Sequence, residues 1–330
     1  MADPREIPTL VSMELTIGDK LTDTLARARA AADGPIGTGQ LLFSLAYDKE
    51  VKPLLDAFDI SSTVVLTVLR TPGRAAAEPD AGRVVDPDAD AAPTPSGEHA
   101  RVRGADGRTV PVSAAAAHAL REAQDSRTAL LAALVDDPAT EASAAIRDCG
   151  INPDEVRQAA LAGHSPQRPD RVAPELRPAR DALLGRTRYR GRGFQDRLLF
   201  SVLARKVNHA ARPVLWTRLE ADEQARRDHR PTRTDDVLLA MLVTHEVAAA
   251  YPHLAHTAKA NYGGGETLLA QGITHTRVRA ATTKGSDEMP PGKILVPGPT
   301  WTEDTRVLLD RLTAHPGNRA TRLLDSLRRA

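Results

Sequence analysis

Apolar residues recur every three or four positions along most of the chain, which is the spacing that places them on one face of an α-helix. From Leu15 to Arg70 this spacing is broken only at Gly34-Pro35 and at Asp59, and it resumes at Ser113. Further stretches with the same spacing follow residue 178. The pattern predicts a chain built mainly from short helices with tight connections.

Composition supports the same fold class. The 330 residues include only four Phe, four Tyr and two Trp beside abundant Ala, Leu and Arg, a mixture that favours helices over strands. We therefore predict an all-α protein. A chain of this length is sufficient for two domains, each with its own hydrophobic core.

Two segments interrupt the helical pattern. Residues 71–110 are rich in Pro, Gly and Asp and nearly lack large apolar side chains, so we expect a disordered acidic loop that can be shortened with little loss of stability. Residues 163–178 contain four prolines and mark a domain boundary. The predicted organisation is a first domain over 1–163, a linker over 164–178 and a second domain over 179–330.

The helical blocks repeat one order of features. A Thr or Ser (Thr38, Ser126, Thr234) precedes paired leucines, and we expect its side-chain oxygen to cap the helix that follows. Each block then has an Asp-Ile or Gly-Ile step; in "CGIN" and "QGIT" the Gly should end one helix, and the Asn or Thr should cap the next. The shared order predicts an internal repeat whose copies pack in pairs.

Two phrases carry a family resemblance. "IGTGQLLFSLA" (residues 36–46) and "CGINPDEVRQAAL" (residues 149–161) resemble the repeat that forms the N-terminal domain of class C Clp unfoldases. The resemblance covers residues 15–70 and 113–162, extends loosely over 219–281 and is weak over 301–330. It implies two tandem helical bundles built from Clp N-type repeats, with the second bundle more divergent.

The resemblance also implies a function. In that family the N-terminal domain receives substrates and adaptors, so this chain, without ATPase modules, would be a non-enzymatic binding protein of the Clp proteolytic system. It would act as an adaptor or as a decoy for Clp-directed cyclic peptides. The implied partners are Clp unfoldase or protease components, their clients, and cyclic peptide ligands.

Candidate ligand-binding residues follow from the same family. Its first helix contributes to the ligand surface, which implies Leu15 together with Phe43 and Tyr47, although Phe43 also fits a core position. The family binds phosphorylated arginine through an acidic residue. That position carries over to Gly39, Arg127 and Asp235, of which only Asp235 can hold a guanidinium by a carboxylate.

The remaining chemistry gives no support for an enzyme. "HEVAA" after Thr244 lacks the spacing of a zinc protease, and no nucleophile–base pattern stands out, so we expect no catalytic residues, metal or cofactor. A single cysteine, Cys149, excludes an internal disulfide, and no apolar stretch is long enough to span a bilayer. We expect a cytoplasmic protein without a membrane partner.

A basic segment offers an alternative function. "GRTRYRGRGF" (residues 185–194) alternates Arg with Gly around Tyr189, and residues 171–233 contain 16 Arg and Lys against seven Asp and Glu. Such segments bind phosphates and stack on bases, so the alternative is a nucleic-acid-associated regulator. A solvated linker is the simpler interpretation, since the whole chain has a formal net charge of only +1. "NYGGGE" (residues 261–266) is interpreted as a flexible connector rather than an anion-binding nest.

The first testable prediction concerns nucleotides. The Gly-Lys pair of "MPPGKILVPG" follows Pro290-Pro291 and precedes Ile294, which does not form a phosphate-binding loop. We expect the purified protein to hydrolyse no ATP and to show no change in melting temperature with ATP and magnesium. A clear upward shift in a thermal denaturation assay would contradict this expectation.

Overall fold

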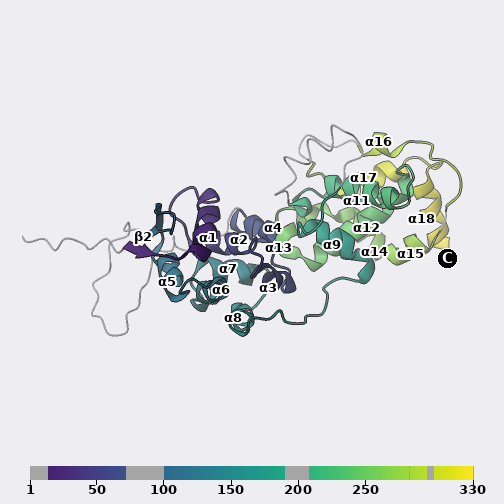
Figure 1. Ribbon diagram of the computed structural model, residues 1–330. Helices are drawn as coiled ribbons and strands as arrows, with labels where there is room; N and C mark the ends of the chain where they lie inside the picture. The colour runs from purple at the N-terminus through teal and green to yellow at the C-terminus, as the bar shows by residue number, and fades with distance from the viewer. Residues whose placement is uncertain (1–13, 72–99, 190–207, 282, 296–300, 330) are drawn as a thin grey trace, which may run out of the picture. The chain divides into compact units, whose positions relative to one another are not determined.

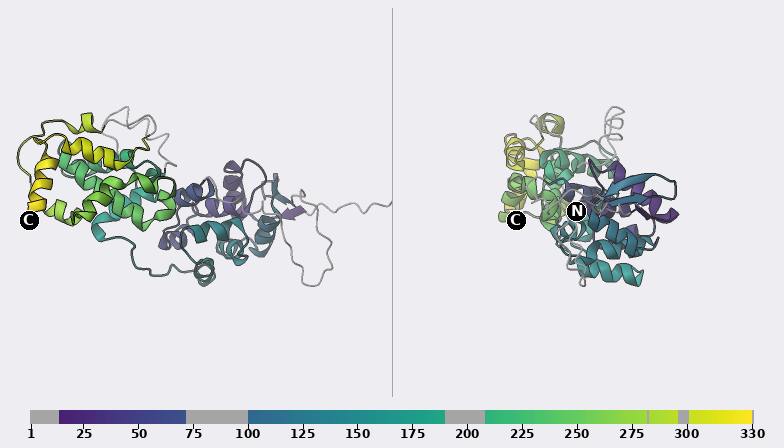
Figure 2. Two further views of the ribbon diagram at one scale, coloured as in Figure 1. Left: turned by 180° about the vertical axis from the view of Figure 1, so that it is seen from behind. Right: turned by 90° about the vertical axis from the view of Figure 1, so that its left-hand side faces the viewer.

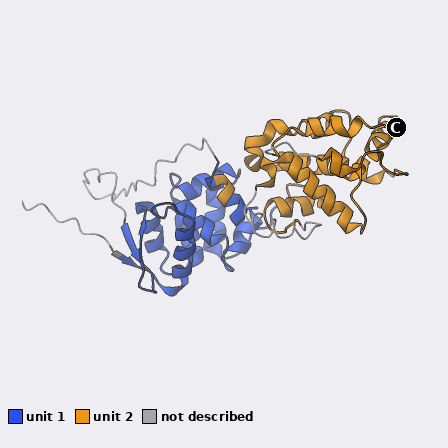
Figure 3. Cartoon of the chain, turned by 90° about the horizontal axis from the view of Figure 1, so that it is seen from above, with its two compact units in different colours: residues 1–65, 69–168 blue, residues 66–68, 169–330 orange. Residues whose placement is uncertain are grey.

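The computed structural model describes residues 14–71, 100–189, 208–281, 283–295 and 301–329. These residues are mostly helical, with one small sheet, so the prediction of an all-α fold is confirmed (Figure 1). The chain divides into two compact units, residues 1–65 with 69–168 and residues 66–68 with 169–330 (Figure 3). The division falls inside the segment predicted as a linker.

The part of the chain before residue 168 folds around the paired leucines of the repeat. Leu41, Leu42, Leu130 and Leu131 are all fully buried. Its helices are α1 (Asp19–Ala30), α2 (Thr38–Leu45), α3 (Lys52–Ala57), α4 (Ser62–Leu69), α5 (Ala114–Glu122), α6 (Arg127–Asp136), α7 (Glu141–Asp148) and α8 (Pro153–Ala162).

A three-stranded sheet corrects the prediction of a loop over residues 71–110. Strands β1 (Glu14–Thr16) and β2 (Ala100–Arg103) are parallel, and β3 (Thr109–Val112) is antiparallel to β2 (Figure 2, right). Val102 is fully buried, so residues 100–110 cannot be removed without exposing core. The loop prediction is wrong there because the strands are short and β2 is held by pairing with β1, whose residues lie 87 positions earlier in the chain (Glu14 pairs with Arg101). Residues 72–99 lie outside the described part of the chain.

The second unit is organised around its longest described helix. Its elements are η1 (Pro174–Leu176), α9 (Arg177–Leu183), η3 (His209–Ala211), α11 (Pro213–Arg227), α12 (Thr234–Ala250), α13 (Pro252–Ala255), η4 (His256–Asn261), α14 (Gly263–Ala270), α15 (His275–Ala280), α16 (Pro291–Ile294), α17 (Thr305–Thr313) and α18 (Arg319–Arg329). Helix α12 packs against α11, α14, α15, α17 and α18. Leu176 is buried, so the predicted linker 164–178 ends earlier than expected and its last residues belong to this unit.

One helix–turn–helix connection occurs three times among the described residues. In each copy an Asp or Gly has a positive φ of 60–71°, and the N–H of the following buried Ile bonds to the carbonyl five residues before it, as in a Schellman motif. The next residue caps the following helix through its side chain. The predicted turns at "CGIN" and "QGIT" are confirmed. The three copies are Asp59-Ile60-Ser61, Gly150-Ile151-Asn152 and Gly272-Ile273-Thr274.

The predicted capping role holds for Ser126, which accepts a hydrogen bond from the N–H of Ala129 at the start of α6, but not for the two threonines. Thr38 and Thr234 are already the first residues of α2 and α12. Their hydroxyls reach across to a second helix instead, where each satisfies an N–H of the first turn, a group with no partner inside its own helix.

We call such a contact a threonine junction: the first residue of one helix is a Thr whose Oγ1 accepts from the N–H of the second residue of another helix. Three are present among the described residues, at Oγ1–N distances of 3.2, 3.0 and 3.0 Å. They join Thr38 of α2 to Ala142 of α7, Thr234 of α12 to Ala320 of α18, and Thr305 of α17 to Gly264 of α14.

The repeat order predicts a fourth junction, between α6 and α3. Here the first residue of α6 is Arg127, which has no hydroxyl, and the second residue of α3 is Pro53, which has no N–H. Acceptor and donor are therefore missing together. Arg127 instead pairs with Asp48, 3.0 Å away in the turn before α3.

The three glycines of residues 263–265 form the first turn of α14, so their interpretation as a flexible connector is wrong. A Cβ on Gly264 would lie 2.4 Å from the carbonyl oxygen of Thr305, and one on Gly265 would lie 2.5 Å from Cβ of His245. The N–H groups of Gly263 and Gly264 donate to Asp304 and Thr305. Close helix packing therefore requires Gly264 and Gly265, and the N–H groups of Gly263 and Gly264 already have acceptors.

The threonine junctions lead to a second testable prediction. Thr38→Val keeps the side-chain shape but removes the acceptor for the buried N–H of Ala142, which should lower the free energy of unfolding by about 1–3 kcal/mol. Thr38→Ser keeps the hydroxyl and is the matched control, with a smaller loss. Urea denaturation of both variants measures the difference, and equal stabilities would refute a role for the hydroxyl.

Candidate functional site

The predicted ligand-binding residues of the first unit lie on β1 and α2. Phe43 is 5% exposed and is a core residue, whereas Tyr47 is 44% exposed. The two rings meet edge to face, with centroids 5.3 Å apart. Leu15 is half-buried on β1, opposite Val102 of β2. Of the three, only Tyr47 presents a large exposed side chain.

Charged groups surround the turn that follows Tyr47. The carboxylate of Asp48 is buried and accepts hydrogen bonds from the N–H groups of Glu50 and Val51. The guanidinium of Arg127 lies 3.0 Å from Asp48 and 4.0 Å from Glu50. Tyr47 is therefore an exposed aromatic ring next to a turn, and the hydrogen bonds and ion pair of Asp48 hold that turn in place.

Asp235, the fourth predicted residue, belongs to the second unit and is already paired. Its Oδ2 accepts from Nε and Nη2 of Arg319, at 3.0 and 2.9 Å, and Nη1 of Arg319 donates to the carbonyl of Gly285 at 2.7 Å. Both side chains are largely buried. The carboxylate predicted to hold a ligand guanidinium thus holds one from its own chain.

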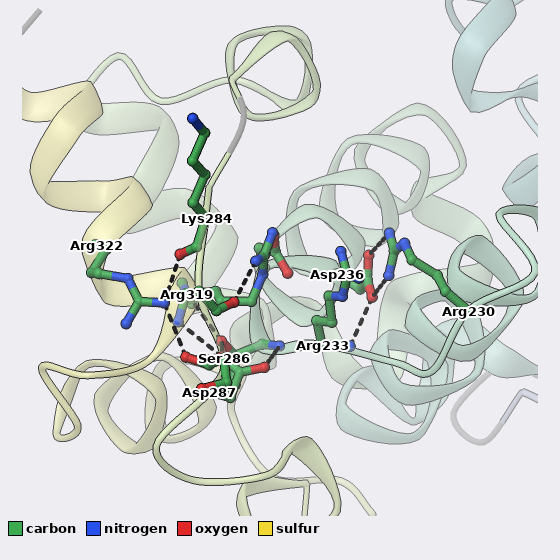
Figure 4. A network of polar contacts seen from close by, with 12 residues as sticks. Arg230, Arg233, Asp236, Lys284, Ser286, Asp287, Arg319 and Arg322 are labelled. Carbon is green, nitrogen blue, oxygen red and sulfur yellow. Dashed lines mark hydrogen bonds and ion pairs between the residues drawn. The ribbon is translucent and has the colours of Figure 1, made fainter.

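Asp287 completes this junction and was not found from the sequence. Its carboxylate accepts from the N–H of Thr234 at 3.1 Å, from the N–H of Arg319 at 2.9 Å and from the hydroxyl of Thr234 (Figure 4). A negative charge placed at the starts of two helices is stabilised by both helix dipoles. Because Asp287 lies 53 residues from Thr234, no local pattern marks it.

A second ion pair fixes the start of α12. Arg230 donates through Nη1 and Nη2 to the two oxygens of Asp236, at 2.6 and 2.7 Å, and Asp236 also accepts from the N–H of Arg233 at 2.8 Å. The hydrogen bond with Asp236 raises the pKa of Arg230 above its usual value. Thr234, Asp235 and Asp236 are therefore all committed to structural contacts.

The aromatic residue of the basic segment, Tyr189, is half-buried and makes two hydrogen bonds. The hydroxyl of Tyr189 donates to Glu220 at 2.9 Å and accepts from Nε1 of Trp216 at 2.8 Å. Burial raises the pKa of both Tyr189 and Glu220, and burial lowers the pKa of the neighbouring His209 to about 4. The hydroxyl of Tyr189 is thus engaged within its own unit. Residues 190–194 lie outside the described part of the chain.

The histidines of the second unit do not converge. Glu246 binds Nδ1 of His275 on α15 at 2.8 Å. Among the described residues there is no group of three or more His, Cys, Asp and Glu placed to hold a metal ion. In the same residues, no single helix has both the length and the apolar composition of a membrane span.

The chain matches no protein-family model, no curated protein and no solved structure. Of the predicted site residues, Leu15, Phe43 and Tyr47 belong to the first unit and Asp235 to the second.

The third testable prediction concerns the Asp235–Arg319 pair. Arg319→Ala would leave a largely buried carboxylate without its counter-charge, and we expect a loss of about 3–5 kcal/mol in the free energy of unfolding. Arg328→Ala, on the exposed side of the same helix, is the matched control and should change stability by less than about 0.5 kcal/mol.

A double-mutant cycle with Asp235→Asn separates the ion pair from the other contacts of Arg319. The double variant should lose less free energy of unfolding than the two single variants lose in sum, because the neutral amide of Asn needs no counter-charge. Strictly additive losses would show that the pair itself contributes nothing.

Proposed function

We propose that this chain is a non-enzymatic binding protein of the Clp proteolytic system, whose first unit binds protein segments or peptide-like ligands. The observation that carries the proposal is the threonine junction. It recurs in both units between helices that the sequence repeat places in equivalent positions. This supports a common repeat, and the common repeat is what resembles the Clp N-terminal domain.

The two phrases that resemble the Clp N-terminal repeat each contain the start of a helix. Residues 36–46 contain the start and body of α2, including the threonine of the first junction. Residues 149–161 contain the Schellman turn and α8. Both phrases therefore contain residues that determine where a helix begins or ends. This is expected if the phrases specify the fold of the repeat.

The first unit supplies the more accessible binding surface. Tyr47 is one of three large apolar side chains found exposed among the described residues, and tyrosine is a frequent anchor of protein interfaces. In the second unit the corresponding acidic position, Asp235, is closed by Arg319. We therefore assign the ligand surface to the first unit, near β1 and the end of α2.

Either role, adaptor or decoy, requires binding without turnover. A decoy lowers the free ligand concentration only in proportion to its own concentration and affinity. An adaptor must in addition contact a Clp unfoldase or protease subunit. The two roles are separated by whether the full chain co-elutes with those subunits in size-exclusion chromatography.

The fourth testable prediction is a calorimetric titration of the full chain with a Clp-directed cyclic peptide. We expect a Kd tighter than about 100 µM, a free energy larger than about 5.5 kcal/mol. Tyr47→Ala should weaken binding about tenfold or more. Leu161→Ala, an exposed apolar residue on α8, is the matched control and should bind as the unaltered chain does.

Two results would contradict the proposal. One is the absence of binding to cyclic peptides combined with no association with any Clp subunit. The other is equal binding by the Tyr47 and Leu161 variants, which would place the ligand elsewhere.

A further inference from the structure

The ring of His245 on α12 lies against the backbone of α14. A Cβ on Gly265 of α14 would lie 2.5 Å from Cβ of His245 and 3.2 Å from its Nδ1. This Nδ1 is buried and, among the described residues, has no hydrogen-bond partner. The neutral ring therefore carries its proton on Nε2, because a proton on Nδ1 would be a buried donor without an acceptor.

Three titratable side chains surround His245. The ring centroid of Tyr262, which precedes α14, is 6.1 Å from that of His245, and its hydroxyl donates to the carbonyl of Ala210 at 2.9 Å. Burial raises the pKa of Tyr262, so this side chain stays neutral. In the described part of the chain, the charged groups that act on His245 are the carboxylates of Glu266, in the first turn of α14, and Glu246, on α12.

The neighbouring His275 of α15 has the acceptor that His245 lacks. Its Nδ1 lies 2.8 Å from both carboxylate oxygens of Glu246, so a proton on that nitrogen is hydrogen-bonded. The same contact engages Glu246. Glu266, which is exposed, is then the carboxylate that remains for a proton on His245. Because Nδ1 of His245 faces Gly265, the ring must turn before it can bond to Glu266.

The packing of α14 favours the neutral form of His245. Burial lowers the pKa of His245, against the opposing effect of Glu266 and Glu246. A group whose pKa is lower in the packed state takes up a proton more readily once the contact opens. The α12–α14 contact is therefore most stable above the ordinary histidine pKa of about 6.5, and it loses stability as the pH falls below that value.

We propose that His245 makes the contact between α12 and α14 sensitive to protons: in mild acid the protonated ring turns from Gly265 to Glu266, and α14 separates locally from α12. The start of α14 remains bonded to α17, through the N–H of Gly264 and the hydroxyl of Thr305, so the change is a local opening. This regulatory property belongs to the second unit and is independent of ligand binding by the first.

Hydrogen–deuterium exchange of the full chain, followed by mass spectrometry, tests the opening. Rates are measured at about pH 7.5 and about pH 5.5 and are corrected for the intrinsic pH dependence of amide exchange. The amides of residues 267–271, which bond within α14 and its last turn, should open at least about threefold more often at the lower pH. An opening rate that does not change with pH would overturn the inference.

Two substitutions identify the responsible histidine. His245→Gln keeps a polar side chain that cannot gain a proton, and it should abolish the acceleration at the lower pH. His256→Gln, at an exposed position on η4 of the same unit, is the matched control and should retain it. Equal acceleration in both variants would overturn the assignment to His245.

A titration of the unaltered chain gives a measurement that does not depend on the folding of a variant. The ring signals of His245 in an NMR titration should have a midpoint below the ordinary value of about 6.5. A midpoint at or above that value would overturn the inference, whether or not His245→Gln folds.

The role of Glu266 has its own variant. Glu266→Gln removes the carboxylate to which the protonated ring turns, and it should reduce the acceleration at the lower pH by about half or more. Asp310→Asn, an exposed carboxylate of α17, is the control and should leave the acceleration unchanged. Unchanged acceleration in Glu266→Gln would overturn the assignment of Glu266 as the acceptor.

Discussion

Both units depend on one constraint: the unsatisfied N–H groups at the start of a buried helix need an acceptor from a neighbouring helix. Every α-helix begins with N–H groups that its own backbone cannot satisfy, and burying such a group without an acceptor costs free energy. Here a threonine hydroxyl at the start of one helix accepts from the start of another, in α2–α7, α12–α18 and α17–α14. Each helix start is thereby placed against its partner in one register.

The same constraint decides which residues are available for ligands. The second residue of α2 is Gly39, and a Cβ there would lie 2.5 Å from Oε2 of Glu141 on α7. The equivalent pair in the second unit is Asp235 with Arg319. In both units this position is filled by a side chain of the partner helix. We therefore look for ligand contacts on the outer surfaces of the first unit instead.

Several polar side chains of the second unit are buried and form hydrogen bonds with one another. Asp287 accepts hydrogen bonds at two helix starts, and the buried Glu220 accepts one from Tyr189, which in turn accepts one from the buried Trp216. Buried polar groups of this kind are stable only when their partners are in place. These residues hold the unit together.

Features encoded within a few neighbouring residues were determined by the sequence itself. Helical periodicity, the paired leucines and the glycine turns at Gly150 and Gly272 depend on local backbone preference and on one buried face. The structure places them as expected.

Features that join distant segments were decided only by the tertiary structure. Strand β2 forms because β1 lies beside it, Thr38 and Thr234 reach other helices rather than their own, and Asp287 lies 53 residues from the helix that it caps. Tyr189 and Asp235, which the sequence marks as candidates for binding, are occupied by partners from other helices. A hydrogen bond needs its two atoms about 3 Å apart, and for such pairs that proximity is a property of the folded chain alone.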